Sequence, residues 1–309
     1  MQGAPAVAAA LSPADPLSSR LMIHLFRLLA RVPLPLAHRM GVALGWLVWC
    51  CSTTYRRNFR TQAQAAGLTP AQVRPAVGAA GAALAELPWV WARPQHESVL
   101  PRVLRWEGVE QYEAALARRK GVITLTPHLG SWEILGQAIG ERFMAEHGPL
   151  TALFRPARKA WLQELVAGAR NRPGLKTLPT TLAGVRGLIR VLRAGGYTGV
   201  LPDQVPPQGQ GVWAPLFGRP AYTMTLVARL IQQTGASVFF SVCERLPRGA
   251  GYVVRFEPFE GTALTDPKAT PEAAAAAMNE GVERLIRRLP GQYMWGYARF
   301  KTPRGEAPA

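Results

Sequence analysis

The stretch GVITLTPHLGSWEILG, residues 121–136, decides the fold class. It begins with apolar and β-branched residues, as a buried strand does, and the apolar residues after Ser131 have helical spacing. Ser131 is a residue type that caps helices, and a helix that starts there places Glu133 in its first turn. A strand that enters a helix through a short turn is the repeating unit of parallel α/β sheets, so we expect such a sheet.

The same alternation continues along the chain after this stretch. It predicts further strands at 150–154, 175–179, 197–202, 237–243 and 251–257, and helices near 131–144, 157–170, 182–194, 222–234 and 271–288. The segment at 203–222 is rich in Pro and Gly, and we expect it to lack regular structure. Because it follows a strand end, where open α/β sheets bind ligands, it is a candidate binding loop.

The chain before residue 100 has long apolar and Ala-rich runs, which predict three or four helices between 17 and 93. We therefore expect a disordered arm at 1–16, a helical module at 17–100, an α/β domain at 101–302 and a tail at 303–309. Residues 40–55 are uncharged but fall short of the roughly 20 apolar residues that span a bilayer. Trp46, Trp49 and flanking arginines suit the surface of an anionic membrane, and an ordinary pair of core helices is the alternative.

Positive charge is in large excess, with 36 Lys and Arg against 19 Asp and Glu, a formal net charge of +17. Such a field attracts phosphates, acidic proteins and anionic lipids about equally, and a solvated basic surface is the alternative. The signatures of nucleic-acid-binding modules are absent, as are the glycine-rich motifs of nucleotide sites, so we expect no nucleic acid partner. The three cysteines have neither disulfide-framework nor metal-ligand spacing, which indicates a reducing compartment and no metal.

His128 and Glu133 are the candidate catalytic pair. His128 lies on the turn between strand and helix, and we expect the Glu133 carboxylate to reach back and hold its imidazole. A histidine held in this way acts as a general base towards an alcohol. The alternative is a histidine that packs a loop beside a glutamate that caps a helix.

A direct reaction of the alcohol is favoured over a covalent enzyme intermediate, because no G-x-S-x-G nucleophile elbow is present and the cysteines lie in apolar runs. The oxyanion then needs donors, for which Arg155 and the backbone N–H groups of residues 128–131 are candidates.

His128, Gly130, Trp132 and Glu133 also carry a family resemblance, together with LFRPAR at 153–158, LPDQ at 201–204, PLFGRPA at 215–221 and QYMWGYARFK at 292–301. These blocks resemble the bacterial lipid A late acyltransferases, the lauroyl and myristoyl transferases. The opening of the chain, with YRRNFR at 55–60, is similar to the membrane-proximal start of that family.

The resemblance implies an αβα sandwich with a mostly parallel central sheet, preceded by an N-terminal helical membrane-proximal module. It implies catalysis by His128 and Glu133, supported by Arg155 and Asp203. The acyl donor would be the phosphopantetheine thioester of acyl carrier protein, with no other cofactor. The acceptor would be a hydroxyl of a lipid A precursor, at the cytoplasmic face of the inner membrane.

Three further residues are weaker candidates for binding substrate: Arg158, Gln204 and Arg219. The segment at 292–301 departs from the family pattern, because Gly296 and Tyr297 stand where a histidine often follows the tryptophan. The acceptor therefore stays open between lipid A precursors and another glycolipid or phospholipid, such as a lysophospholipid or an aminolipid. The donor also stays open between acyl carrier protein and coenzyme A, and the acyl chain length is not determined. A non-catalytic protein that binds anionic membranes is a further alternative.

Overall fold

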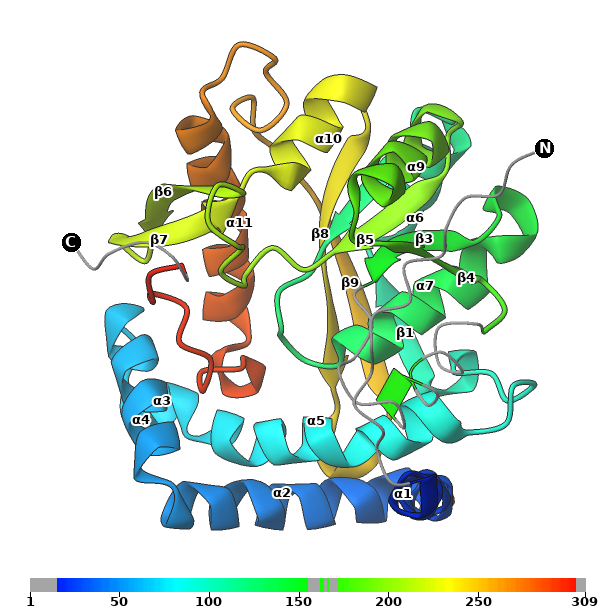
Figure 1. Cartoon of the computed structure of the whole chain (residues 1–309), viewed down its shortest axis with the longest axis vertical. Helices are drawn as coiled ribbons and strands as arrows, with labels where there is room; N and C mark the ends of the chain where they lie inside the picture. Colours follow the sequence, from blue (N-terminus) through cyan, green and yellow to red (C-terminus); the bar gives the residue numbers. More distant parts are fainter. Residues whose placement is uncertain (1–15, 155–161, 164–165, 167–171, 304–309) are drawn as a thin grey trace.

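The computed structural model describes residues 16–154, 162–163, 166 and 172–303. The chain begins with helices that wrap one end of the molecule (Figure 1). They are α1 (Pro16–Leu29), α2 (Leu34–Cys51), α3 (Thr53–Ala65), α4 (Pro70–Val73) and α5 (Pro75–Ala92). The expected arm at 1–16 and tail at 303–309 lie almost wholly outside the described residues, as does most of the expected helix at 157–170.

Helices α2 and α5 run side by side along the lower edge of Figure 1. They approach so closely because glycines face one another: a Cβ on Gly41 would lie 2.6 Å from the carbonyl oxygen of Gly81. Gly45 likewise faces the carbonyl oxygen of Val77. Side chains at these positions would force the backbones apart, so the pair is fixed by small residues rather than by interlocking large ones.

The central sheet has five strands in the order β1-β9-β8-β2-β5. Their bounds are β1 Val103–Glu107, β2 Val122–Leu125, β5 Tyr197–Val200, β8 Ser237–Arg245 and β9 Tyr252–Pro258. All neighbours are parallel except β8 and β9, which are antiparallel. The expected largely parallel sheet is confirmed, and the sequence reading missed its edge strand β1.

Helices cover both faces of this sheet, because alternate strand residues point to opposite sides. Ile123 and Phe240 pack in a cluster with α9 (Leu182–Arg193), α10 (Leu226–Thr234) and α11 (Pro271–Arg288). Val122 and Phe239 pack in a second cluster with α6 (Val109–Ala117) and α7 (Trp132–His147). The result is three layers, α, β and α. Residues of α3 and α5 contribute to these same clusters, so the N-terminal helices share the core of the sheet.

Two small sheets flank the central one. Strands β3 (Leu150–Phe154) and β4 (Leu175–Pro179) are parallel, and β6 (Gly211–Leu216) and β7 (Arg219–Met224) form an antiparallel hairpin. The expectation that 203–222 lacks regular structure is therefore wrong for its second half. The Pro215 and Pro220 pair sits within this isolated two-stranded ladder, where a missing N–H is tolerated at an edge. The helix expected at 222–234 consequently begins later, at Leu226.

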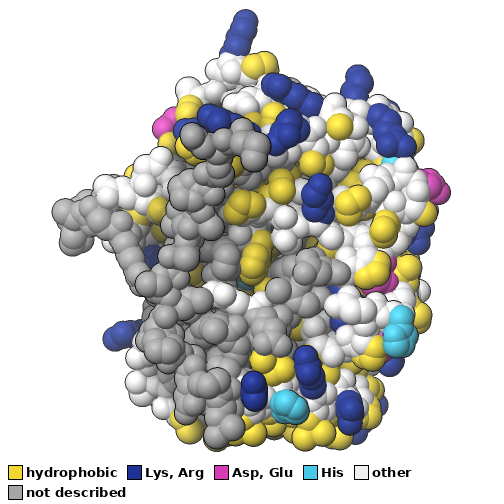
Figure 2. Space-filling view, turned by 45° about the vertical axis from the view of Figure 1, so that its right-hand side comes forward, with side chains coloured by type: hydrophobic (Ala, Val, Ile, Leu, Met, Phe, Trp, Pro, Cys, Tyr) yellow, Lys and Arg dark blue, Asp and Glu magenta, His cyan; other side chains and the backbone are white. Residues whose placement is uncertain are grey.

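The outward faces of α1 and α2 are apolar, and Figure 2 shows hydrophobic side chains gathered along this lower edge beside basic ones. Helix α2 is the one helix among the described residues that is long and apolar enough to cross a membrane, and only 28% of it is buried. Its buried residues lie on the face towards α5, so its exposed apolar residues form a separate stripe. The exposed apolar residues of the two helices include Leu21, Leu25, Leu28, Leu36, Met40, Leu44 and Leu47.

Candidate active site

The site forms where two neighbouring parallel strands end. His128 follows β2, and Asp203 follows β5, which pairs with β2 in register. Because parallel neighbours end at the same edge of a sheet, residues 75 positions apart meet here. This edge is the crevice in which open α/β sheets bind their ligands.

Asp203 holds His128 through two bonds. Its Oδ1 lies 2.7 Å from Nδ1 of the imidazole, and its Oδ2 accepts a hydrogen bond of 2.9 Å from the His128 backbone N–H. The carboxylate is almost fully buried, at 2% exposure, whereas the ring keeps 14%. Asp203 thus fixes both the position and the orientation of a ring that still reaches solvent.

The paired carboxylate decides which ring nitrogen of His128 carries the proton. An ionised carboxylate only accepts hydrogen bonds, so Nδ1 donates and Nε2 keeps its lone pair. The amide nitrogen of Gln204 lies 3.0 Å from Nε2 and is the matching donor. In this tautomer Nε2 of His128 is the hydrogen-bond acceptor, and it faces the exposed side chain of Gln204.

The surroundings of Asp203 keep it ionised. Burial alone would raise its pKa, but the electrostatic interaction and the two hydrogen bonds with His128 lower it below the ordinary value, and the charge of Arg299 adds to this effect. Arg299 is buried and anchored by the backbone carbonyl of Tyr222 and the hydroxyl of Thr223. The Tyr293 phenol lies beside the carboxylate, and burial together with the Asp203 charge raises the pKa of that phenol.

The turn that carries His128 is clamped by two distant segments. Gly130 has a φ of +61°, and a Cβ there would collide with the carbonyl oxygen of Cys243 in β8. The N–H of Gly130 donates to Gln292 and that of Met294 donates to the His128 carbonyl. The geometry of the turn therefore depends on glycine and on the C-terminal segment.

The backbone N–H groups of this turn are all in use, which corrects one expectation. Those of His128, Leu129, Gly130 and Ser131 donate to Asp203, Pro127, Gln292 and Cys243 respectively. They are not available to a substrate oxyanion in this conformation. Arg155, the other expected donor, lies outside the described residues, and so does Arg158.

Glu133 lies in the first turn of α7, as expected, but the carboxylate that contacts the His128 ring is that of Asp203. Oε2 of Glu133 accepts a hydrogen bond of 3.1 Å from the indole of Trp91 in α5. We expected Glu133 to bond to the imidazole, but Asp203 bonds to Nδ1 and Gln204 lies beside Nε2, so both ring nitrogens already have partners. Glu133 still lines the same cavity as His128.

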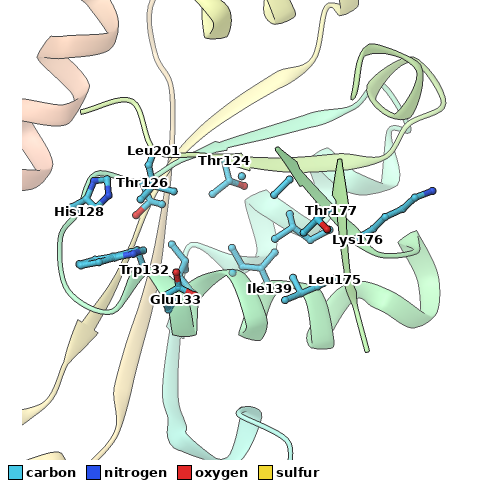
Figure 3. A pocket seen from close by; sticks show the side chains of 15 residues that line it. Thr124, Thr126, His128, Trp132, Glu133, Ile139, Leu175, Lys176, Thr177 and Leu201 are labelled. Carbon is cyan, nitrogen blue, oxygen red and sulfur yellow. The ribbon is translucent and has the colours of Figure 1, made fainter. Parts of the chain in front are cut away.

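That cavity runs from His128 into the protein between α7 and the strands (Figure 3). His128 and Trp132 stand at one end, and Lys176 and Thr177 at the other. Its volume is about 240 Å³. Most of the lining between the ends is apolar: Leu135, Gly136, Ile139, Leu150, Ala152, Leu175, Gly199 and Leu201.

A wider groove, of about 860 Å³, opens on the other side of His128. It lies between α9, α10 and the segment that follows Asp203, and it includes Gln204. Its polar lining includes Arg229 and Gln210. Because Gln204 lines this groove and its amide nitrogen lies beside Nε2 of His128, Nε2 faces the groove.

A buried ionic cluster around Glu86 contacts the turn that carries His128. Glu86 of α5 accepts hydrogen bonds from Arg245, Ser131 and Tyr252, and Nε2 of His38 in α2 lies 3.1 Å from it. Burial would raise the pKa of Glu86, but the charge and hydrogen bonds of Arg245, with those from His38 and Ser131, lower it to about 2. The Ser131 hydroxyl is thereby committed to Glu86 and does not cap α7.

The structure brings together three of the expected site residues, His128, Asp203 and Gln204, and places Glu133 on the cavity they share. Arg219 lies instead on the β6–β7 hairpin, where its guanidinium stacks over Phe300. Sequence reasoning missed Glu86 and Arg299. Glu86 was a lone acid within an uncharged, Ala-rich run, which was the signal that could have found it.

Three known proteins are similar in sequence to this chain. The chain is 29% identical to the lipid A biosynthesis lauroyltransferase of Escherichia coli K12 over 226 residues, which cover 72% of this chain and 69% of that enzyme. It is 28% identical to the palmitoleoyltransferase of the same organism over 74% of this chain and 71% of that enzyme. A lipid A biosynthesis acyltransferase of Haemophilus influenzae is 25% identical over 91% of this chain and 89% of that protein.

The family profile described as bacterial lipid A biosynthesis acyltransferase matches residues 16–302, nearly the whole chain. The match includes the turn at 126–133, Asp203 and the C-terminal segment that clamps the turn. The chain is an acyltransferase and belongs to the bacterial lipid A biosynthesis acyltransferase family.

Proposed function

We propose that this protein transfers a fatty acyl group from the thioester of acyl carrier protein to a hydroxyl of a lipid A precursor. The observation that carries the proposal is the His128–Asp203 pair, whose imidazole lines both a narrow cavity and a wider groove. The acyl chain occupies the cavity, because its lining between the two ends is mostly apolar. The acceptor lies in the groove, because Nε2 of His128 faces it.

The chemistry follows from the tautomer of His128. Displacement of the Gln204 amide lets a hydroxyl of the acceptor bond to Nε2, which removes the proton as the oxygen attacks the thioester carbonyl. Asp203 stabilises the imidazolium that forms. The C–S bond then breaks, the carrier sulfur takes the proton from the imidazolium, and an ester and a free thiol are the products.

Glu133 has an electrostatic role in this proposal. Its carboxylate lines the cavity beside His128, and Trp91 fixes it there. A second negative charge near the ring stabilises the imidazolium of the transition state more than the neutral ring of the resting state. The excess positive charge of the chain suits both an acidic carrier protein and a phosphorylated acceptor.

The same proposal places the enzyme on the cytoplasmic face of the inner membrane. The exposed leucines of α1 and the outer stripe of α2 fit a membrane surface, with α2 lying in the interface because its other face is packed on α5. Relatives named for lipid A biosynthesis support this location, since their lipid products are membrane lipids.

The test is a transfer assay with purified protein, an acyl carrier thioester and a lipid A precursor, read by mass spectrometry of the lipid. We expect an ester product from the native protein and none from His128→Ala. A lysophospholipid offered in parallel decides between acceptors: a product formed from it alone would overturn the lipid A assignment. Thiol release without any ester product would indicate hydrolysis instead of transfer.

A further inference from the structure

A separate cavity lies at the corner where α2 ends and α3, α4 and α5 meet, at the lower left of Figure 1. Its volume is about 700 Å³, and its surface is mostly apolar. The half-buried indoles of Trp46 and Trp49 form much of its wall, with Phe59 beside them. It is lined by none of the residues that line the cavity or the groove at His128.

Two arginines at this corner cavity lie over the tryptophan rings. The guanidinium of Arg60 lies 5.6 Å from the ring centre of Trp49, and that of Arg74 lies 5.5 Å from the ring centre of Trp46. Both arginines are exposed, and none of the described residues that line the cavity is acidic. Stacking on an indole leaves the N–H groups at the guanidinium edge directed to the surroundings, where they suit a phosphate.

The cavity also adjoins the apolar outer stripe of α2. Leu44 and Leu47 of that helix are 46% and 59% exposed, and they flank Trp46 in sequence. An occupant with an apolar chain and an anionic phosphate would meet both kinds of surface at once. A free phosphate would use only the arginines, and an acidic protein would leave the deep aromatic wall unused.

We propose that this corner cavity binds one anionic phospholipid from the membrane on which the enzyme rests. An acyl chain packs against Trp46 and Trp49, and the phosphate lies between Arg60 and Arg74. The site is distinct from the acceptor groove, so this lipid is not a substrate. It instead holds the C-terminal end of α2 at a fixed depth in the membrane.

The test uses the full chain with phosphatidylcholine vesicles that contain brominated phosphatidylglycerol or, in a second set, brominated phosphatidylcholine beside unlabelled phosphatidylglycerol. Bromine on an acyl chain quenches only tryptophans that it touches. A Trp46→Phe/Trp49→Phe variant isolates the contribution of the two indoles by subtraction. With all protein bound, we expect these indoles to be quenched more strongly by brominated phosphatidylglycerol.

The matched variants separate the site from general charge. Arg60→Gln/Arg74→Gln should abolish the preference for phosphatidylglycerol at the two indoles. Arg27→Gln/Arg57→Gln removes the same charge from exposed positions on α1 and α3 outside the cavity and should keep this preference. Either pair weakens overall vesicle binding by about fivefold per arginine, which corresponds to about 1 kcal/mol for each basic residue near the surface.

Equal quenching by the two brominated lipids in the native protein would overturn the proposal, and so would a preference that survives Arg60→Gln/Arg74→Gln. Loss of that preference on adding acyl carrier protein would assign the cavity to the carrier. The experiment measures lipid contact and not turnover. A negative result would therefore not contradict the proposed acyl transfer by His128, which the transfer assay tests separately.

Discussion

Asp203 bonds both the ring and the backbone N–H of His128, so one carboxylate sets the tautomer and the position of the base together. Asp203→Asn keeps the size of the side chain but offers an amide that can hold the ring in the wrong tautomer. We expect kcat to fall by about 10³–10⁴-fold with little change in KM, by analogy with the loss when a triad aspartate is amidated. Steady-state kinetics would measure it.

A matched control is Gln204→Ala, which removes the group on the opposite ring nitrogen. Because that amide must leave before an acceptor binds, kcat should change by less than about tenfold. Loss of a general acid or base lowers the rate by about 10²–10⁴-fold, so the two effects can be told apart. Equal losses in Asp203→Asn and Gln204→Ala would contradict the assignment of Asp203 as the residue that orients the base.

Glu133 allows a test of charge against geometry. Glu133→Gln retains an oxygen that accepts from the Trp91 indole but removes the negative charge, and kcat should fall by about 10²-fold. Trp91→Phe removes the hydrogen bond and keeps the charge, so its effect should be smaller. If Trp91→Phe is as damaging as Glu133→Gln, position rather than charge is what Glu133 contributes.

Glu86 should control stability. Glu86→Gln leaves Arg245 buried beside a neutral partner, and the free energy of unfolding at pH 7 should fall by about 3–5 kcal/mol. Urea denaturation followed by circular dichroism would measure it. A change below about 1 kcal/mol would show that the cluster adds little beyond its hydrogen bonds.

The same residue predicts a pH dependence. Folding lowers the pKa of Glu86 from 4.5 to about 2, so its contribution is complete above pH 4.5 and is lost as the pH falls towards 2. The stability difference between the native protein and Glu86→Gln should therefore shrink across that range. A difference that stays constant down to pH 2 would contradict the assignment.

The narrow cavity offers a prediction about acyl chain length. Among the described residues, no atom outside the neighbouring residues and the backbone of α7 lies within 4 Å of where a Cβ on Gly136 would stand, so this glycine leaves open space in the lining. Gly136→Leu fills that space and should shift preference towards shorter chains, by about 10- to 200-fold per excluded methylene group.

Gly136→Ala is the control for the cavity, since it adds only one carbon and favours the helix by roughly 0.5–1 kcal/mol. Competition between acyl carrier thioesters of different lengths, read as product ratios, would measure both variants. An unchanged ratio in a folded Gly136→Leu enzyme would place the acyl chain elsewhere.

Local signals predicted much of this architecture. The strand and helix on either side of His128, and five further strands, follow from apolar runs bounded by turns. The β6–β7 hairpin was missed because Pro and Gly mark loops in general, while an isolated ladder tolerates them. The partner of His128 was missed for another reason: Glu133 is near in sequence, whereas Asp203 becomes near only once β5 pairs with β2.

The clamp on the catalytic turn ties the geometry of His128 to a segment far along the chain. Gln292 and Met294 complete the turn through their backbone hydrogen bonds to Gly130 and His128. A protein that loses this segment keeps His128 and Asp203 but lacks the bonds that shape the turn between β2 and α7. Proteolytic removal of the segment would therefore inactivate the enzyme without touching either residue.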